Sequence, residues 1–321
     1  MYNIVFSIPI HEKFEVVLDL ICNIRHFNPN CGIVFHLSKT FNYRDSKISK
    51  DQFLDIVNRI GDIWINPESL RSGRNDIIQT HILNFSFVKN FIDFDYFAFC
   101  ASNESFIRSN VYDYMKNFEW GSKNRAIVRP EDWRFGKELF NDFDLLRSFS
   151  SPDYKIVFSN TEGQFFKKAL FEKICDKINS FYDYREMEVP YPRDEIYFST
   201  FARNIKDHAE QPIGDIYTYS AYHFHFLWDV TRFEIDKLLR GNNHVYSIKR
   251  VDRNLNDGIR AMLRDHFGYA SEVREWLGNA IELKSFNNVE IDIGSLNKST
   301  KQLFQNWRKI PKFFTNRWKT K

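Results

Sequence analysis

Residues 2–37 read YNIVFSIPIHEKFEVVLDLICNIRHFNPNCGIVFHL. Residues 2–8 form an apolar run typical of a buried strand, and Ile33–Leu37 forms a second. Between them, after a turn at Pro9–Glu12, apolar side chains recur at helical spacing at Phe14, Val17, Leu18, Ile21 and Ile24. This order predicts a βαβ unit, in which a helix joins two parallel strands.

The same alternation continues as far as Cys100. A helix is expected at Lys50–Arg59, a strand at Ile63–Ile65, a long helix from about Asn75 to Phe91, and a strand at Tyr96–Cys100. Strands separated by helices predict a mostly parallel sheet covered on both faces. The fold class is therefore α/β, a Rossmann-type sheet flanked by helices, with ligands at the carboxyl ends of the strands.

Polar loops follow the first, second and fourth predicted strands, at the edge where a ligand is expected. They hold Ser7, Pro9 and His11, then His36, Ser38 and Lys39, and then Ala101, Ser102, Asn103 and Glu104. We expect a nucleotide-type ligand there. The sequence has no GxGxxG or Walker A motif, so the dehydrogenase and P-loop NTPase classes lose most of their support.

After Glu104 the pattern predicts a mixed α+β region. Helices are expected near Asn110–Phe118, over an apolar face from Phe165 to Ile174, near Thr231–Leu239 before Gly241, and near Asp257–Phe267. Strands are expected at Ala126–Val128, Lys155–Ser159 and Val245–Ile248. Since no linker-like stretch interrupts the chain, we expect one large domain over residues 1–290 and a tail over 291–321.

Residues 191–201 read YPRDEIYFSTF and place two acids where a helix is expected to begin. Pro192 disfavours a helix before it, and Asp194 is a suitable N-cap. The carboxylate of Glu195 could then act as a general base that takes a proton from an attacking hydroxyl. The alternative is a structural cap whose acids complement the helix dipole.

The composition is that of a folded protein. With 321 residues, of which 43% are hydrophobic and 17% aromatic, the chain can build a large core. No basic leader precedes the first apolar run, and no stretch approaches the length of a membrane-spanning segment. The scattered cysteines (Cys22, Cys31, Cys100 and Cys175) favour buried thiols in a reducing cytoplasm over disulfides or a zinc site.

Charge is concentrated at the C-terminus. The formal net charge is +3, but Lys298–Lys321 carries eight basic residues and no acid. Aromatic and aliphatic residues lie among these cations, which is typical of a segment that binds an anionic membrane surface. The alternative is a basic helix that packs its aromatic side chains on the domain. No nucleic-acid-binding module is visible, so no nucleic-acid partner is expected.

Four segments occur in a recognisable order. They are the turn at Gly73–Arg74 before a helix with Gln79, His81 and Asn84, then Ser102–Phe106 (SNESF) after a strand, Glu162–Phe166 (EGQFF) and Pro192–Phe198 (PRDEIYF). In order and approximate spacing, over roughly residues 1–260, the set resembles glycosyltransferase family 14. This family contains the core-2/I-branching N-acetylglucosaminyltransferases and the peptide O-xylosyltransferases. The absence of their disulfide network suits a bacterial-type cytoplasmic member.

The resemblance implies a GT-A fold and an inverting, metal-independent transfer from a nucleotide sugar, with Glu195 as the base. No cofactor is then expected, and fixed cations would stabilise the departing diphosphate. The expected donor-binding residues are Pro9, His11, Ser38, Gly73, Arg74, Ser102, Asn103, Glu104, Asp194, Lys249, Arg250 and Arg253. Glu131, Trp133 and Glu162 are expected to bind the acceptor through hydrogen bonds and stacking.

The resemblance identifies the donor and the acceptor less directly than the type of reaction. A UDP-sugar is the expected donor, although the segment His36–Lys39 lacks the Asp that often holds the nucleoside in this family. The expected acceptor is a hydroxyl of a glycan or of a lipid-linked saccharide in surface polysaccharide synthesis. This enzyme would work in the cytoplasm, with the basic tail as a peripheral attachment to the inner face of the membrane.

Two other functions stay open. A metal-dependent transferase would use an Asp-x-Asp pair at a strand's carboxyl end, and the chain has such pairs at Asp93/Asp95 and Asp142/Asp144. The first pair precedes its strand and the second lies in a predicted helix, so we expect no metal there. His223 and His225 alternate on an extended segment and could share a zinc ion, but no third zinc ligand of convincing spacing is visible. A non-catalytic glycan-binding protein is the remaining alternative.

Overall fold

A computed structural model describes residues 1–71, 77–149, 153–181, 191–205, 211–223, 226–241, 244–256, 258–278 and 281–283. The N-terminal elements follow the predicted order: β1 (Tyr2–Ile10), α1 (Phe14–Phe27), β2 (Cys31–Leu37), α2 (Lys50–Ile60), β3 (Ile63–Ile65), α3 (Ile77–Val88) and β4 (Phe94–Phe99). The predicted βαβ unit is therefore confirmed. Gly73, Arg74, His225 and the tail over 291–321 lie outside the described residues.

The central sheet has the strand order β10-β6-β9-β4-β1-β2-β3, with β6 at Trp120–Gly121, β9 at Phe165–Lys167 and β10 at Ile213–Gly214. Strand β1 is parallel to β2 and β4, whereas β9 is antiparallel to β4 and to β6. The prediction of a mostly parallel α/β sheet is thus confirmed. The chain adds β2 and β3 on one side of β1 and then β4 on the other, and such a switch point creates a ligand crevice at the carboxyl ends.

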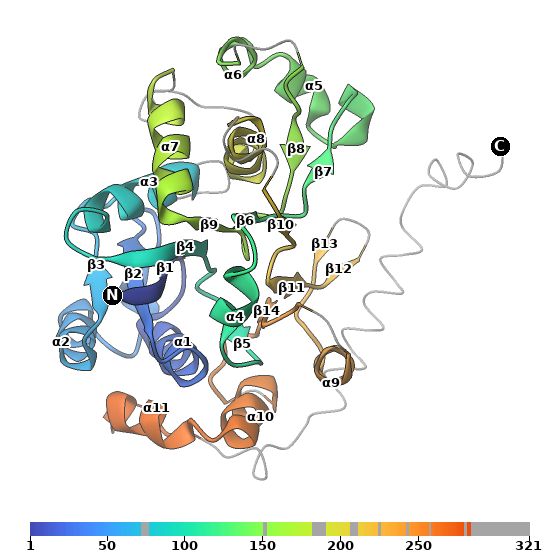
Figure 1. Cartoon of the computed structure of the whole chain (residues 1–321). Coiled ribbons are helices and arrows are strands. Elements are labelled where there is room, and N and C mark those ends of the chain that lie inside the picture. The colour runs from blue at the N-terminus through green and yellow to red at the C-terminus, as the bar shows by residue number, and fades with distance from the viewer. Residues whose placement is uncertain are drawn as a thin grey trace.

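Helices cover both faces of this sheet (Figure 1). Helices α1 and α2 lie on one face, and α3, α7 (Lys168–Asn179) and α8 (Tyr197–Asn204) lie on the other. Side chains of β1 alternate accordingly. Ile4 and Phe6 belong to the hydrophobic core formed with α1 and α2, and Val5 belongs to the core formed with α3, α7 and α8. Because both faces are buried, the strand is mostly apolar, with Asn3 and Ser7 as its polar residues, which is why it could be recognised in the sequence.

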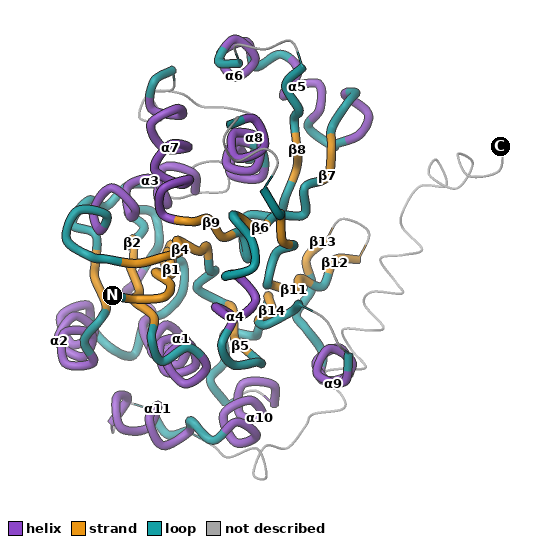
Figure 2. The backbone as a smooth tube through the Cα atoms, viewed as in Figure 1, coloured by secondary structure: helices purple, strands orange, loops and turns teal. Residues whose placement is uncertain are grey.

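A smaller sheet lies beside the carboxyl ends of β1 and β4 (Figure 2). It has the order β11-β14-β5, with β5 at Glu104–Phe106, β11 at Thr218–Ser220 and β14 at Ser247–Lys249. Helices α10 (Gly258–Phe267) and α11 (Ala270–Leu277) follow it in the chain, and α11 packs against α1. The small sheet therefore brings the basic end of β14 next to the end of β4.

The remaining elements are short. They are α4 (Val111–Met115), β7 (Arg125–Ala126), α5 (Gly136–Phe140), α6 (Phe143–Arg147), β8 (Val157–Phe158), β12 (Tyr222–His223), β13 (Phe226–Leu227), α9 (Arg232–Arg240), and 3-10 turns at Tyr43–Asp45, Pro130–Asp132 and Arg193–Glu195. Across the described ranges, the helices are all too short or too polar to cross a membrane.

Two local predictions are wrong. Phe165 and Phe166 belong to strand β9, and the helix that was predicted to include them begins only at Lys168. Asp194 is not the N-cap of α8, because Ile196 occupies that position and Asp194 lies in the preceding 3-10 turn. Its carboxylate accepts a hydrogen bond from the hydroxyl of Thr161 instead.

Candidate functional site

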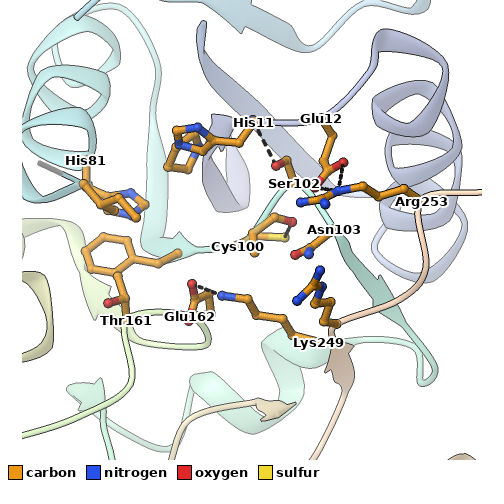
Figure 3. Close-up of a pocket in the computed structure, with 15 residues that line it drawn as sticks. His11, Glu12, His81, Cys100, Ser102, Asn103, Thr161, Glu162, Lys249 and Arg253 are labelled. Atoms are coloured by element: carbon orange, nitrogen blue, oxygen red, sulfur yellow. Dashed lines mark hydrogen bonds and ion pairs between the residues drawn. The ribbon is translucent and has the colours of Figure 1, made fainter. Parts of the chain in front are cut away.

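A cavity of about 290 Å³ opens at the carboxyl ends of β1, β4 and β14 (Figure 3). Its lining includes seven of the predicted donor-binding residues, namely Pro9, His11, Ser102, Asn103, Lys249, Arg250 and Arg253. Glu162, which was predicted to bind the acceptor, also lines it. The cavity lies where parallel sheets of this kind bind their ligands, and its volume is close to the lower end for small-molecule sites.

Strand β14 and the segment after it bring three cations to the cavity. It pairs with β11 on one side and β5 on the other, and Lys249 is its last residue. The backbone N–H of Val251 then donates to the carbonyl of Asn103 at 3.0 Å, which ties the segment after β14 to the loop after β4. Arg250 and Arg253 leave this segment toward the same cavity.

Each of these cations contacts a carboxylate. The Lys249 ammonium pairs with Glu162, and Nε of Arg250 lies 3.2 Å from Oδ1 of Asp229. Nε of Arg253 donates to both carboxylate oxygens of Glu12, at 2.6 and 2.8 Å. Glu12 is only 2% exposed, and burial raises its pKa while the Arg253 guanidinium acts in the opposite direction.

The opposite wall of the cavity is uncharged at neutral pH. Burial lowers the pKa of His11 to about 4 and that of His81 to about 3. The His81 ring stacks on Phe99 at 3.9 Å between centroids, and its Nδ1 lies 2.8 Å from Oγ of Ser7. This wall offers aromatic surface and neutral imidazole nitrogens, whereas the β14 side offers cations.

Two predicted donor residues are buried and do not line the cavity. Glu104 is fully buried, and burial raises its pKa to about 7. It accepts hydrogen bonds from the Ala101 N–H at 2.9 Å and from the hydroxyls of Thr218 and Ser247, so it joins the loop after β4 to β11 and β14. Ser38 is buried as well, and its hydroxyl lies 3.1 Å from that of Thr40.

The segment 159–163 links the cavity to the turn that holds Asp194 and Glu195. Thr161 and Glu162 line the cavity, and Thr161 also donates to Asp194, whose pKa burial raises to about 6. The Ser159 N–H donates to the Glu195 carbonyl at 2.9 Å. Gly163 has φ +81°, and a Cβ there would lie 2.7 Å from the Thr218 nitrogen, so only glycine fits this link.

The Glu195 side chain is not among those that line the cavity. It is 19% exposed, and its Oε1 lies 3.7 Å from Nη2 of Arg134. Trp133 packs edge to face on Tyr191 at 5.8 Å, while Glu131 is exposed on the same loop. The structure therefore groups Glu131 and Trp133 with Glu195, and groups Glu162 with the donor-side residues.

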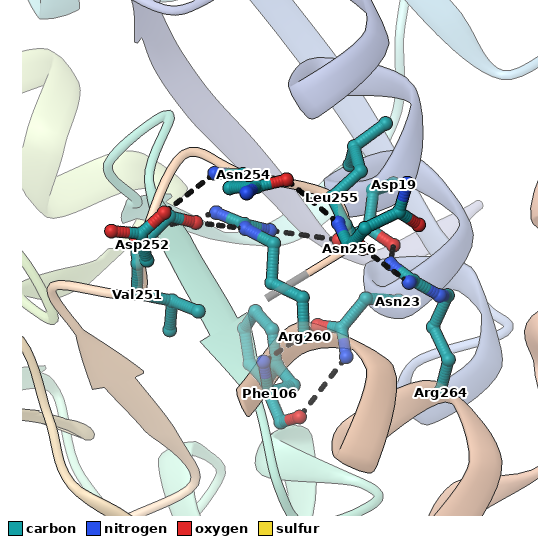
Figure 4. Close-up of polar contacts among 10 residues, drawn as sticks. All are labelled: Asp19, Asn23, Phe106, Val251, Asp252, Asn254, Leu255, Asn256, Arg260 and Arg264. Carbon is teal, nitrogen blue, oxygen red and sulfur yellow. Dashed lines mark hydrogen bonds and ion pairs between the residues drawn. The ribbon is translucent and has the colours of Figure 1, made fainter. Parts of the chain in front are cut away.

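Two buried arginines fix the segment that carries Arg253, and sequence reasoning missed them (Figure 4). Nη1 of Arg260 and Nη1 of Arg264 lie 2.7 and 3.0 Å from the carboxylate of Asp19 on α1. Arg260 also donates to the carbonyls of Val251 and Asp252, and Arg264 to that of Leu255. A signal was present: Asp19 is the one charged residue between Val16 and Ile24 of α1, and a buried acid needs a partner.

Both Asp-x-Asp pairs contribute structural contacts. Asp95 accepts a hydrogen bond from the Tyr112 hydroxyl at 2.7 Å. Asp142 caps α6 by accepting from the Leu145 N–H at 3.0 Å, and it also accepts from the Tyr191 and Tyr197 hydroxyls. Within the described part of the chain, no group of three His, Cys, Asp or Glu side chains is placed to hold a metal ion. All four cysteines are free and buried.

Comparisons with known proteins give likenesses to solved structures alone. No protein-family model matches the chain. No curated protein matches it either. Among solved structures, the chain is similar to a nucleoside-diphosphate-sugar pyrophosphorylase from Vibrio cholerae RC9, at 10% sequence identity and a TM-score of 0.38, over 66% of this chain and 91% of that chain.

Proposed function

We propose that this protein is an inverting, metal-independent glycosyltransferase with a GT-A-like fold and a nucleotide-sugar donor, most simply a UDP-sugar. One observation carries the proposal: three cations from β14 and the segment after it converge on a cavity at the carboxyl ends of β1 and β4. Cations fixed there would bind a diphosphate, and the uncharged wall with His11 and His81 suits a nucleoside.

In the proposed reaction, Glu195 takes the proton of an acceptor hydroxyl. The hydroxyl oxygen bonds to the anomeric carbon of the donor as the bond from that carbon to the diphosphate oxygen breaks. Negative charge grows on the diphosphate in this step, so Lys249, Arg250 and Arg253 stabilise the transition state more than the ground state. Trp133 and Glu131 on the neighbouring loop would hold the acceptor.

Several predicted donor residues take positioning roles in this proposal. Glu104 orients the loop with Ser102 and Asn103 from behind, and Asp194 holds the segment that ends at Glu162 through its bond to Thr161. Ser38 supports the loop after β2. Gly73 and Arg74 keep the donor-binding role that the resemblance implies.

The test measures ligand binding and turnover together. Wild-type protein is expected to bind UDP in calorimetry and to turn over a nucleotide sugar in the presence of EDTA. Glu195→Gln should keep UDP binding and lose about 10²- to 10⁴-fold in turnover, the usual contribution of a general base. Glu275→Gln, an exposed acid on α11, serves as the matched control.

Two outcomes would refute the proposal and favour another function. Activity that EDTA abolishes and manganese restores would make the protein a metal-dependent transferase. Glycan binding with no turnover of any nucleotide sugar would make it a glycan-binding protein.

We also propose that the acceptor is a glycan or lipid-linked saccharide and that Lys298–Lys321 attaches the enzyme to an anionic membrane. Its eight cations and interspersed aromatic residues support this attachment. A variant ending at residue 297 should no longer sediment with phosphatidylserine-containing liposomes at low salt. Equal sedimentation of the two proteins would refute the attachment.

A further inference from the structure

The cations of the cavity are neutralised before any ligand arrives. Lys249 is paired with Glu162, Arg250 with Asp229, and Arg253 with Glu12. A diphosphate brings negative charge of its own into this balanced site. To contact the cations it must compete with the carboxylates that now hold them, so ligand binding here involves an exchange of partners.

The pair between Lys249 and Glu162 is the one most enclosed on both sides. Its side chains are 14% and 17% exposed, whereas Arg253 is 54% exposed and the Arg250–Asp229 pair is 39% and 52% exposed. Both Lys249 and Glu162 line the cavity. A partner exchange at this pair therefore changes the electrostatics inside the cavity, where solvent screens it least.

The backbone under each member of the pair is fixed. Lys249 ends a strand that has partners on both sides. Glu162 precedes Gly163, whose N–H donates to the Phe99 carbonyl at 3.0 Å and whose carbonyl accepts from the Tyr217 N–H at 3.2 Å. Only the side chains can rearrange, and the four-carbon stem of lysine allows its ammonium to move by rotation alone.

We propose that Glu162 is a donor-released carboxylate that recognises the transferred sugar. When the diphosphate takes the ammonium of Lys249, the carboxylate of Glu162 is freed inside the cavity and accepts hydrogen bonds from hydroxyls of the sugar. This inference rests on the proposed function and moves Glu162 from the acceptor side to the donor side. It commits the donor to a sugar with free hydroxyls.

The proposal predicts opposite effects on two ligands. In Glu162→Gln the competitor for Lys249 is gone, so UDP and inorganic pyrophosphate should bind about 3- to 10-fold tighter. A hydrogen bond from the sugar to a charged acceptor is weakened, so the UDP-sugar should lose about 10-fold or more in affinity relative to UDP. A purely structural role for Glu162 would weaken both ligands together.

The experiment is calorimetry with UDP, pyrophosphate and a UDP-sugar on wild type, Glu162→Gln, Glu162→Asp and Asp229→Asn. Glu162→Asp keeps the charge and should bind UDP like wild type, and Asp229→Asn should change UDP affinity less than twofold because that pair is solvent-exposed. Thermal unfolding of each variant reports folding. If Glu162→Gln does not fold, Glu162→Ala replaces it, and UDP binding no tighter to Glu162→Ala than to wild type would overturn the inference.

The outcomes distinguish a failure of the Glu162 inference from a failure of the glycosyltransferase proposal. If wild type binds and turns over a nucleotide sugar but Glu162→Gln binds UDP no tighter than wild type, the donor-released carboxylate is refuted and the glycosyltransferase proposal stands. If wild type binds none of the three ligands, both are refuted. Tighter UDP binding with a smaller preference for the UDP-sugar supports the inference.

Discussion

Replacing Asp19 by Ala is expected to lower the free energy of unfolding by about 3–5 kcal/mol. Asp19 is 1% exposed and lies 2.7 Å from Arg260 and 3.0 Å from Arg264, which are themselves at most 1% exposed. Removing the carboxylate takes this counter-charge away from two buried guanidinium groups, which also donate to backbone carbonyls. An uncompensated buried charge of this kind costs far more than the loss of a surface pair.

The assay is urea and thermal unfolding. For a chain of 321 residues the entropy of unfolding is about 0.7 kcal/mol/K, so this loss corresponds to a fall in Tm of about 4–7 °C. The control is Asp55→Ala, which breaks the 3.2 Å pair with Arg59, where the side chains are 70% and 60% exposed. It should change the free energy of unfolding by less than about 0.5 kcal/mol.

A loss below about 1 kcal/mol for Asp19→Ala would refute this reasoning about buried charge. A second variant separates stability from function. Asp19→Leu with Arg260→Met and Arg264→Met should regain most of the lost stability, because apolar residues of similar volume replace the whole ion cluster. The UDP affinity of this triple variant should be lower than that of wild type. The carbonyls of Asp252 and Leu255, on either side of Arg253, have lost the guanidinium groups that donate to them. Wild-type UDP affinity would show that the cluster does not position the cations.

Three further predictions concern the cavity and the segment beside it. Lys249→Ala should weaken UDP binding at least about tenfold with little change in Tm, as measured by calorimetry and thermal unfolding. Gly163→Ala should lower the free energy of unfolding by more than about 1 kcal/mol in urea titrations, because φ is +81° and the new Cβ meets the Thr218 backbone. Burial lowers the pKa of His81 to about 3, so its contribution to stability is present above about pH 6.5 and is lost as the pH falls. His81→Gln should therefore flatten the acid-side decline by up to about 1.4 kcal/mol per pH unit between about pH 6 and 4, as read from urea midpoints.

The predictable part of the fold is the part with long, doubly buried elements. Residues 2–37 could be assigned because a strand buried on both faces is mostly apolar and α1 shows helical spacing over four turns. Strand β9 could not, because three residues show no period and Phe165 and Phe166 merge with the apolar spacing of α7. Strands β6 and β10 have two residues each, and only their pairing defines them.

The candidate site divides in the same way. The three cations could be predicted because Lys249, Arg250 and Arg253 lie at or just after the end of a strand, within five residues of one another. Their carboxylate partners could not, because Glu12 lies 241 positions from Arg253 and the contact exists only after the small sheet has formed. The pKa of His81 depends likewise on burial against Phe99, which no local pattern reveals.

These long-range contacts imply an order of dependence within the molecule. Asp19 lies on α1, directly after the strand whose end forms one wall of the cavity, and Arg260 and Arg264 lie on α10, directly after the segment with Arg253. The ion cluster therefore sets the distance between the cations and the end of β1 from behind, without contacting the cavity. Because that cluster is buried, it can form only when α10 is docked on α1, so the segment with Arg253 is fixed beside the cavity only after α10 has packed.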